Sequence, residues 1–321
     1  MNRRQLLKAV SAVAALPGIA FAQAFPSKPI RYIVPVAAGG GNDMIARVVT
    51  QRWGELLGQP FVVDNQSGGG GVVASQLTAR AAPDGYTLMQ GYVATHGTTP
   101  ATRKVSYDAV KQFTPIGMIG ATPNVLVVNA NVPVKTVAEF IDYVKHNQNV
   151  SYGSAGPGSL THMTMELLKQ ESGINLLHVP YRGIAPAITD LLGGQTQAMF
   201  PGLAAALPHL RSGKMRALAV TGKARSPQLK DVPTMEEAGF KGFDAMQWYG
   251  TVGPAGMAPD VVKRLNETQV AVLQSPDLSE KLAGEAVEPW PMSPDQFGQY
   301  IRAEIARWTA LAKARNIQLE D

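Results

Sequence analysis

Two glycine-rich turns carry residue types that bind small anions. The first spans residues 34–43, with the sequence VPVAAGGGND, and the second spans residues 152–159, with the sequence YGSAGPGS. Each turn lies between an expected strand and an expected helix, so bare backbone N–H groups meet the positive end of a helix dipole there. Because more than a hundred residues separate them, the turns predict a cleft that binds one small anion from both sides.

Several side chains of these turns suit the same task. Asp43 is expected first to cap the helix after the first turn and second to contact a ligand or a water. Ser154, Ser159 and Thr161 suit either capping of the second helix or contact with an anion, and His162 could instead be a surface residue. The other candidate contacts in the two turns are Gly39, Gly40, Gly41, Asn42, Ala155 and Gly156.

Four further segments are expected to form walls of the cleft, because open α/β sheets bind ligands at the carboxyl ends of their strands. Arg182 suits a carboxylate contact or an internal salt bridge. Trp248 lies where the chain passes between lobes, and core packing is its stronger interpretation. The other candidates in these segments are Tyr92, Thr95, His96, Tyr181, Phe200, Pro201 and Gly202.

Short apolar runs alternate with helical patterns along the chain, which is typical of βα units and largely parallel sheets. The strands expected before residue 247 are residues 30–34, 61–63, 86–89, 125–128, 150–152, 177–179, 198–200 and 217–220. A strand at 248–252 then returns to the first part of the chain. Helices are expected to begin at Pro259 and at Ser293, which forms a capping box with Gln296.

This order of elements predicts a two-lobed α/β fold in which the second lobe is inserted in the first. Residues 25–124 and 247–321 form the first lobe, and residues 125–246 form the second. The two crossings of the chain, near Asn124 and near Gln247, are the expected hinges. The ligand cleft then lies between the lobes.

Residues 1–24 have the pattern of an export signal. Arg3, Arg4 and Lys8 form a basic start, residues 6–20 are apolar but short for a membrane helix, and small-x-small cleavage sites end at Ala22 and Ala24. The twin arginine fits the twin-arginine route, although ordinary secretory signals also carry two arginines. We therefore expect a mature protein in the periplasm.

Charge and composition exclude several classes of function. Without the signal the chain has 26 basic and 24 acidic residues, a net charge of +2, and its Lys and Arg residues are scattered. This pattern excludes nucleic acid as a partner. The absence of cysteine excludes disulfides, thiolate metal sites and cysteine nucleophiles. No later segment has the ~18 apolar residues of a membrane helix, so we expect a soluble monomer.

The sequence shows no catalytic or metal-binding constellation. Gly69-x-Gly71-x-x-Ala74 formally matches a dinucleotide fingerprint, but the next expected strand lacks the acidic residue that would hold a ribose. Tyr152 stands where a nucleophile elbow has glycine. The five histidines include no His-x-x-x-His pair. We therefore expect no cofactor, no metal and no catalysis. Two alternatives stay open: an exported α/β enzyme acting on carboxylates, and a sensory receptor.

Ordered sequence blocks run through nearly the whole mature chain. They are residues 25–30 (FPSKPI), 39–43 (GGGND), 82–88 (APDGYTL), 123–128 (PNVLVV), 152–156 (YGSAG), 178–183 (HVPYRG), 190–195 (DLLGGQ), 216–220 (RALAV) and 231–234 (DVPT). In these blocks the chain resembles the periplasmic solute receptors of tripartite tricarboxylate transporters, also called Bug receptors. The resemblance implies a Venus-flytrap receptor, type II-like, that captures a small carboxylate and delivers it to membrane permease subunits.

One departure from the family bears on the class of ligand. After the strand that ends at Phe200 the family often has Asp-Asn, where this chain has Pro201-Gly202. An acidic residue there could meet a ligand ammonium, and Asp43 is the only acidic side chain in the loops assigned to the cleft. We therefore expect a dicarboxylate, a keto or hydroxy acid, or an aromatic acid to bind more tightly than aspartate or glutamate.

Overall fold

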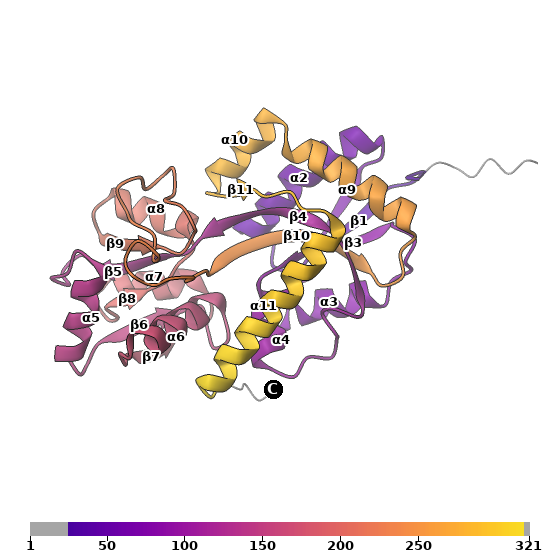
Figure 1. Ribbon diagram of the computed structural model, residues 1–321. Helices are drawn as coiled ribbons and strands as arrows, with labels where there is room; N and C mark the ends of the chain where they lie inside the picture. Colours follow the sequence, from indigo (N-terminus) through magenta and orange to yellow (C-terminus); the bar gives the residue numbers. More distant parts are fainter. Residues whose placement is uncertain (1–24, 318–321) are drawn as a thin grey trace, which may run out of the picture.

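Two β-sheets with helices packed on them form two lobes that lie side by side (Figure 1). The computed structural model describes residues 25–317. The expected export signal, residues 1–24, lies outside the described residues.

The first sheet has six strands in the order β11-β4-β10-β3-β1-β2. β1 pairs in parallel with β2 and β3, whereas β10 pairs antiparallel with β3 and β4. The strands are β1 (Ile30–Val34), β2 (Phe61–Asn65), β3 (Thr87–Tyr92), β4 (Phe113–Pro123), β10 (Met246–Pro254) and β11 (Glu288–Pro289). Its helices are α2 (Gly41–Leu57), α3 (Val72–Ala79), α4 (Thr99–Thr102), α9 (Pro259–Leu273), α10 (Pro276–Gly284) and α11 (Pro294–Ala314), with a 3₁₀ turn η1 (Gly69–Gly71) and a π turn η2 (Ala94–Thr98).

The second sheet has five strands in the order β7-β6-β8-β5-β9. β6 is parallel to β7 and β8, and β5 is antiparallel to β8 and β9. Both sheets are therefore mixed, and the expectation of largely parallel sheets is wrong where β5 and β10 run against their neighbours. The strands are β5 (Val125–Asn129), β6 (Ser151–Ser154), β7 (Leu177–Pro180), β8 (Ala198–Met199) and β9 (Met215–Val220), and the helices are α5 (Val137–His146), α6 (Leu160–Ser172), α7 (Ile184–Leu192) and α8 (Leu203–Arg211).

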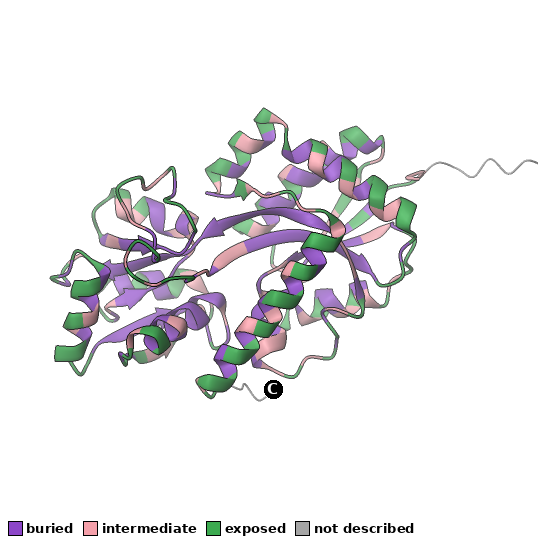
Figure 2. Ribbon diagram, in the orientation of Figure 1, coloured by how far each residue is buried: buried purple, intermediate pink, exposed green. Residues whose placement is uncertain are grey.

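Apolar strands and the inner faces of the helices form the core of the first sheet, as the burial pattern in Figure 2 shows. Trp53 of α2 is an example: its ring stacks on Phe61 of β2 at 4.9 Å, and its indole N–H donates to Thr268 Oγ1 of α9 at 2.8 Å. One side chain near the C-terminal end of α2 thus joins α2, β2 and α9, which fixes this helix against the sheet.

Two long antiparallel strands, β4 and β10, connect the lobes (Figure 1). β4 passes into β5 through Asn124, whose backbone N–H donates to Thr221 Oγ1 at 2.9 Å and whose side-chain amide donates to Phe200 O at 3.2 Å. The register of the pair places Gln247 opposite Thr122. Residues of the β4–β10 pair therefore lie between the two lobes.

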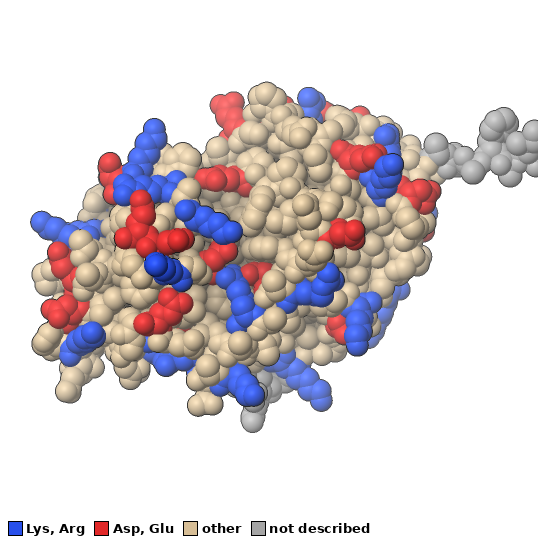
Figure 3. Space-filling view, viewed as in Figure 1, with Lys and Arg blue, Asp and Glu red and all other residues tan. Residues whose placement is uncertain are grey.

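Within residues 25–317, none of the helices is both long enough and apolar enough for a membrane crossing. On the face that Figure 3 shows, Lys and Arg are interspersed with Asp and Glu, and the described residues there form no large patch of one sign. This mixed pattern agrees with the scattered charges of the sequence.

Candidate functional site

A cavity of about 350 Å³ lies between the two lobes. Residues from both sheets and their helices line it. The lining residues are Gly41, Asn42, Ile45, Tyr92, Val93, Ala94, Thr122, Asn124, Gln247, Tyr249 and Glu285 from the first part of the fold, and Ala155, Ser159, Leu160, Thr161, Ile184, Gly202, Ala204 and Ala205 from the second.

Four helix N-termini converge on this cavity: those of α2, α6, α7 and α8. The residues before α2, α7 and α8 are Gly40, Gly183 and Gly202, and none of these three helices has a side-chain cap. The first amides of a helix lack acceptors within the helix, and the dipole adds positive potential there. The arrangement therefore suits an anion with oxygen acceptors, such as a carboxylate.

The turn before α6 is held by its own hydroxyl groups. Ser159 is the N-cap and accepts from the backbone N–H of His162 at 3.4 Å, while Thr161 Oγ1 accepts from the N–H of Ala155 at 2.8 Å. Ser154 Oγ accepts from the N–H of Gly156 at 3.1 Å and lies 2.6 Å from His178 Nε2. Ser159 and Thr161 line the cavity. Ser154 is fully buried and stabilises the turn through its bond to Gly156 without lining the cavity.

His162 is buried, not a surface residue, and it does not line the cavity. Its Nδ1 accepts from the N–H of Gly158 at 3.0 Å, and its ring stacks on His178 at 4.1 Å. Burial lowers the pKa of both histidines to about 4, and for His162 the charge of His178 adds to the effect. Both rings are therefore neutral near pH 7, so His162 offers no positive charge to an anion.

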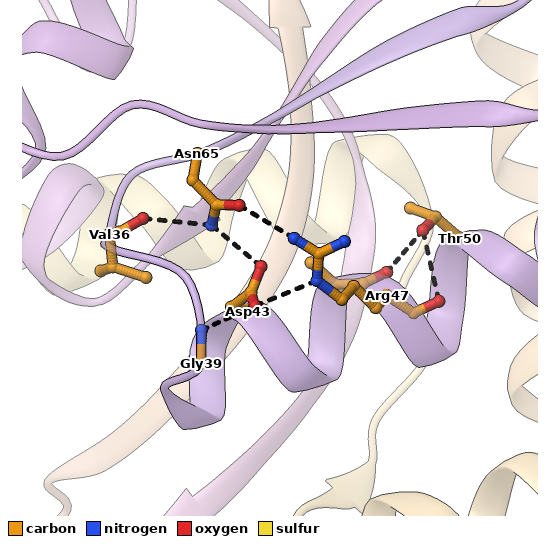
Figure 4. Close-up of polar contacts among 7 residues, drawn as sticks. Val36, Gly39, Asp43, Arg47, Thr50 and Asn65 are labelled. Carbon is orange, nitrogen blue, oxygen red and sulfur yellow. Dashed lines mark hydrogen bonds and ion pairs between the residues drawn. The ribbon is translucent and has the colours of Figure 1, made fainter.

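Asp43 does not cap α2 as the sequence predicts; Gly40 is the N-cap, and Asp43 is the third residue of the helix. Its Oδ2 accepts from the N–H of Gly39 at 2.8 Å and from Arg47 Nε at 3.0 Å, and its Oδ1 accepts from Asn65 Nδ2 at 2.9 Å (Figure 4). Burial alone would raise the pKa of Asp43, but these hydrogen bonds outweigh it and lower the pKa. Asp43 is 4% exposed and does not line the cavity, so it shapes the turn.

Other predicted wall residues pack into the core. Trp248 is fully buried, and its indole N–H donates to Glu304 Oε2 at 2.9 Å, in agreement with the core-packing interpretation. Phe200 stacks on Phe243 at 6.0 Å. His96 is also fully buried, and burial lowers its pKa to about 3. The structure places none of these three in the cavity wall.

The remaining candidates divide between the cavity and its surroundings. Tyr181 donates its hydroxyl to Asp190 Oδ2 at 2.6 Å, and Arg182 is exposed on the loop before α7. Thr95 Oγ1 bonds to the backbone of Tyr92. The sequence-predicted residues that line the cavity are Gly41, Asn42, Tyr92, Ala155, Ser159, Thr161 and Gly202; those that do not are Gly39, Gly40, Asp43, Thr95, His96, Ser154, Gly156, His162, Tyr181, Arg182, Phe200, Pro201 and Trp248.

Five polar residues of the cavity wall are not among the binding candidates that the sequence predicts: Thr122, Asn124, Gln247, Tyr249 and Glu285. Glu285 adds an acidic side chain from outside the loops that the sequence assigns to the cleft, in which Asp43 is the only one. It follows α10, a helix that was not predicted although its start at residues 275–277 has the same Ser-Pro-Asp sequence as the start of α11. That signal could have revealed α10, but not that its last turn faces the cavity.

Ser154 and His178 have the spacing of a nucleophile and its base. However, Ser154 is fully buried and neither residue lines the cavity, so this pair cannot reach a molecule bound there. Among residues 25–317, no group of three His, Cys, Asp or Glu side chains is placed to hold a metal ion.

Proteins of known family and structure are similar to this chain. Residues 45–317 match the family described as tripartite tricarboxylate transporter family receptor. Protein BugT of Bordetella pertussis (strain Tohama I) is 34% identical and is aligned over 100% of each chain. R. palustris Rpa4515, solved with adipate, is 36% identical, with a TM-score of 0.80 over 90% of this chain and 97% of that one. MatC (Rpa3494) from Rhodopseudomonas palustris, solved with bound malate, is 32% identical, with a TM-score of 0.76 over 89% and 99%.

Proposed function

We propose, since the chain belongs to the tripartite tricarboxylate transporter receptor family, that it captures a small organic carboxylate and delivers it to the membrane permease subunits of such a transporter. The chain is a solute-binding receptor of this family, with the two-lobed α/β fold of periplasmic binding proteins. One observation carries the proposal: four helix N-termini from both lobes meet at one cavity, and three of them have no side-chain cap.

The energetics of this arrangement favour a bound carboxylate. A carboxylate that leaves water needs hydrogen-bond donors in return, and backbone amides and ordered waters supply them. Each helix N-terminus contributes about 0.3 to 1 kcal/mol, and up to ~2 kcal/mol when partly buried. Several helix ends acting together therefore offset part of the cost of removing one carboxylate from water, and direct hydrogen bonds from the amides offset more.

The proposed ligand is a dicarboxylate, a keto or hydroxy acid, or an aromatic acid. The related structures with adipate and with malate support an organic acid as the ligand class. Tyr92 and Tyr249 line the cavity and could flank a flat ring.

Capture involves closure of two lobes. We assign residues 25–124 and 247–321 to one lobe and residues 125–246 to the other, because the chain leaves the first sheet after β4 and returns to it at β10. The hinges are near Asn124 and Gln247, which both line the cavity. A ligand that contacts both lobes stabilises the closed state by its differential affinity.

The proposed site of action is the periplasm, where the mature protein works as a monomer after cleavage near Ala22 or Ala24. N-terminal sequencing of protein from the native host should find a start within a few residues of Gln23. Soluble cytoplasmic protein that retains Met1 would contradict this location.

Two other functions, catalysis and sensing, would each leave a signature that transport does not. An exported enzyme acting on carboxylates would change its ligand, whereas a receptor releases it intact, so mass spectrometry of the recovered ligand distinguishes them. A sensory receptor would use the same binding site, and only the partner that the closed form binds separates sensing from transport.

A thermal-shift screen tests the proposal. The panel holds mono-, di- and tricarboxylates, aromatic acids and acidic amino acids, with neutral amides of the same acids as controls. We expect at least one acid to raise the melting temperature and its amide to have no effect. A panel in which no acid stabilises the protein would contradict carboxylate capture.

A further inference from the structure

We propose that Glu285 selects ligands with a carboxylate at one end and a hydroxyl or ammonium donor at the other. The helix N-termini of the second lobe bind the carboxylate, and Glu285 binds the donor. This inference rests on the proposed carboxylate capture and adds the orientation in which the ligand lies in the cavity. Glu285 also supplies an acidic group that could meet a ligand ammonium, which the loops assigned to the cleft from the sequence do not offer beyond Asp43.

The charges of the cavity wall support the assignment of the donor end of the ligand to Glu285. Glu285 is the only residue with a charged side chain among the lining residues, which include no Lys, Arg or His. Among the described residues, no cationic side chain lies within 4 Å of the Glu285 carboxylate. A carboxylate without a cation beside a binding cavity favours a ligand group that donates hydrogen bonds.

The position of Glu285 explains which end of the ligand it meets. α10 packs against α2, and a side-chain carbon built on Gly41 would lie 3.3 Å from Glu285 Oε2. The carboxylate thus lies against the first residue of α2, where the helix dipole stabilises it. The positive end of α2 is already matched by this internal anion, whereas the N-termini of α6, α7 and α8 remain for the ligand carboxylate.

The neighbours of Glu285 on the cavity wall add polar groups at the same end. Tyr249 lines the cavity together with Glu285, and burial, with the Glu285 charge as a smaller cause, raises the pKa of this tyrosine. Thr122 is 3% exposed, lines the cavity, and its hydroxyl oxygen has no hydrogen-bond partner among the described residues. β11 follows Glu285 closely and pairs with Ala121, the neighbour of Thr122. An unpartnered buried hydroxyl is a second group that a polar ligand end can satisfy.

Glu285 is therefore expected to lower the affinity for a ligand that carries a second carboxylate. A dianion would bring its far carboxylate toward Glu285 with no cation between them, and like charges at short range repel more strongly away from bulk water. A hydroxyl or ammonium at the same place replaces the water that Glu285 loses when the lobes close. The wild-type cavity therefore prefers a donor-ended acid to a dicarboxylate of equal length.

Isothermal titration calorimetry on two matched ligand series tests this preference. The four-carbon series is butyrate, 4-hydroxybutyrate, 4-aminobutyrate and succinate, and the six-carbon series is hexanoate, 6-hydroxyhexanoate, 6-aminohexanoate and adipate. In the series that binds, we expect the wild-type protein to bind a donor-ended acid about tenfold more tightly than the dicarboxylate. Glu285→Gln should raise the affinity for the dicarboxylate about tenfold and lower that for the amino acid by a similar factor.

Glu280→Gln is the matched control, because Glu280 is an exposed carboxylate on α10, the helix that Glu285 follows, and does not line the cavity. It should bind all eight acids as the wild-type protein does, and equal melting temperatures would show that both variants are folded. A wild-type preference for the dicarboxylate that Glu285→Gln leaves unchanged would overturn the inference while carboxylate capture stands. Failure of all eight acids to bind would also overturn it, and the broader thermal-shift screen then decides separately whether carboxylate capture fails.

Discussion

Asp43 Oδ1 accepts a hydrogen bond of 2.9 Å from Asn65 Nδ2, which ties the first turn of α2 to the end of β2 (Figure 4). The same amide donates to Val36 O at 3.2 Å, on the loop that leads into the glycine turn. The other Asp43 oxygen holds the N–H of Gly39. The turn that presents Gly41 to the cavity is therefore fixed by a buried carboxylate that does not itself reach the ligand.

Asp43→Ala should weaken both the fold and the binding of carboxylates. Without the carboxylate, the N–H of Gly39 and the amide of Asn65 lose their acceptor, which costs about 1–3 kcal/mol of unfolding free energy. Urea unfolding and calorimetry check the two effects, with exposed Lys145→Ala of α5 as the control. If Asp43→Ala lowers stability but leaves ligand affinity intact, the order of this turn is not needed for binding.

The stacked pair His162 and His178 should make stability depend on pH. The pKa of each is lowered to about 4 in the folded protein, from about 6.5 in the unfolded chain, because burial disfavours the charged ring. The unfolded state then binds more protons between these values, so the stabilisation is complete above about pH 6.5 and is lost as the pH falls toward 4. Glu166, whose pKa is lowered despite burial by its bonds to Lys169, Tyr152 and Arg315, adds a loss at still lower pH.

Urea unfolding at several pH values between 7 and 4.5 measures this dependence. His162→Asn keeps an acceptor for the N–H of Gly158 but does not titrate, so its stability should fall less over the same range. Equal slopes for the wild-type protein and the variant would show that His162 titrates normally in the folded state.

Trp248→Phe should lower stability without changing ligand affinity. The variant keeps most of the packing against Phe297 and Tyr300, but it removes the N–H that donates to Glu304 Oε2, a buried carboxylate. The loss of one hydrogen bond to such a group costs about 1–3 kcal/mol. A tenfold loss of affinity at unchanged stability would instead place Trp248 in the binding wall.

Small-angle X-ray scattering should detect closure of the lobes. A ligand that contacts Glu285 of one lobe and the N-termini of α6, α7 and α8 of the other favours the closed state in proportion to its differential affinity. The radius of gyration should therefore decrease at saturating ligand. A constant radius at saturation would argue against a flytrap.

Local sequence patterns predicted most elements, and long-range contacts explain what they missed. β1 spans Ile30–Val34 as expected, and the capping box of Ser293 and Gln296 is present at the start of α11. β4 was missed because proline and glycine interrupt it. Gly120 is required there, since a side-chain carbon would lie 2.5 Å from Glu288 O, and only the folded structure reveals that neighbour.

Local sequence pattern also revealed the family and part of the site, whereas long-range contacts supply the rest of the cavity wall. The ordered sequence blocks indicated the family, which the matches confirm, and the two glycine-rich turns supplied backbone groups of the cavity such as those of Gly41 and Ala155. Thr122 and Gln247 enter the wall through the register of β4 and β10, which pairs residues more than a hundred positions apart. Glu285 enters through the packing of α10 on α2. Neither contact can be read from local pattern.

A crystal structure of the protein with the tightest-binding acid of the screen tests the central claim most directly. We expect the ligand in the cavity between the lobes, with a carboxylate oxygen within about 2.7–3.2 Å of backbone N–H groups at the start of α6, α7 or α8. A ligand carboxylate bound outside this cavity, or bound inside it without any of these helix N-termini, would contradict the account.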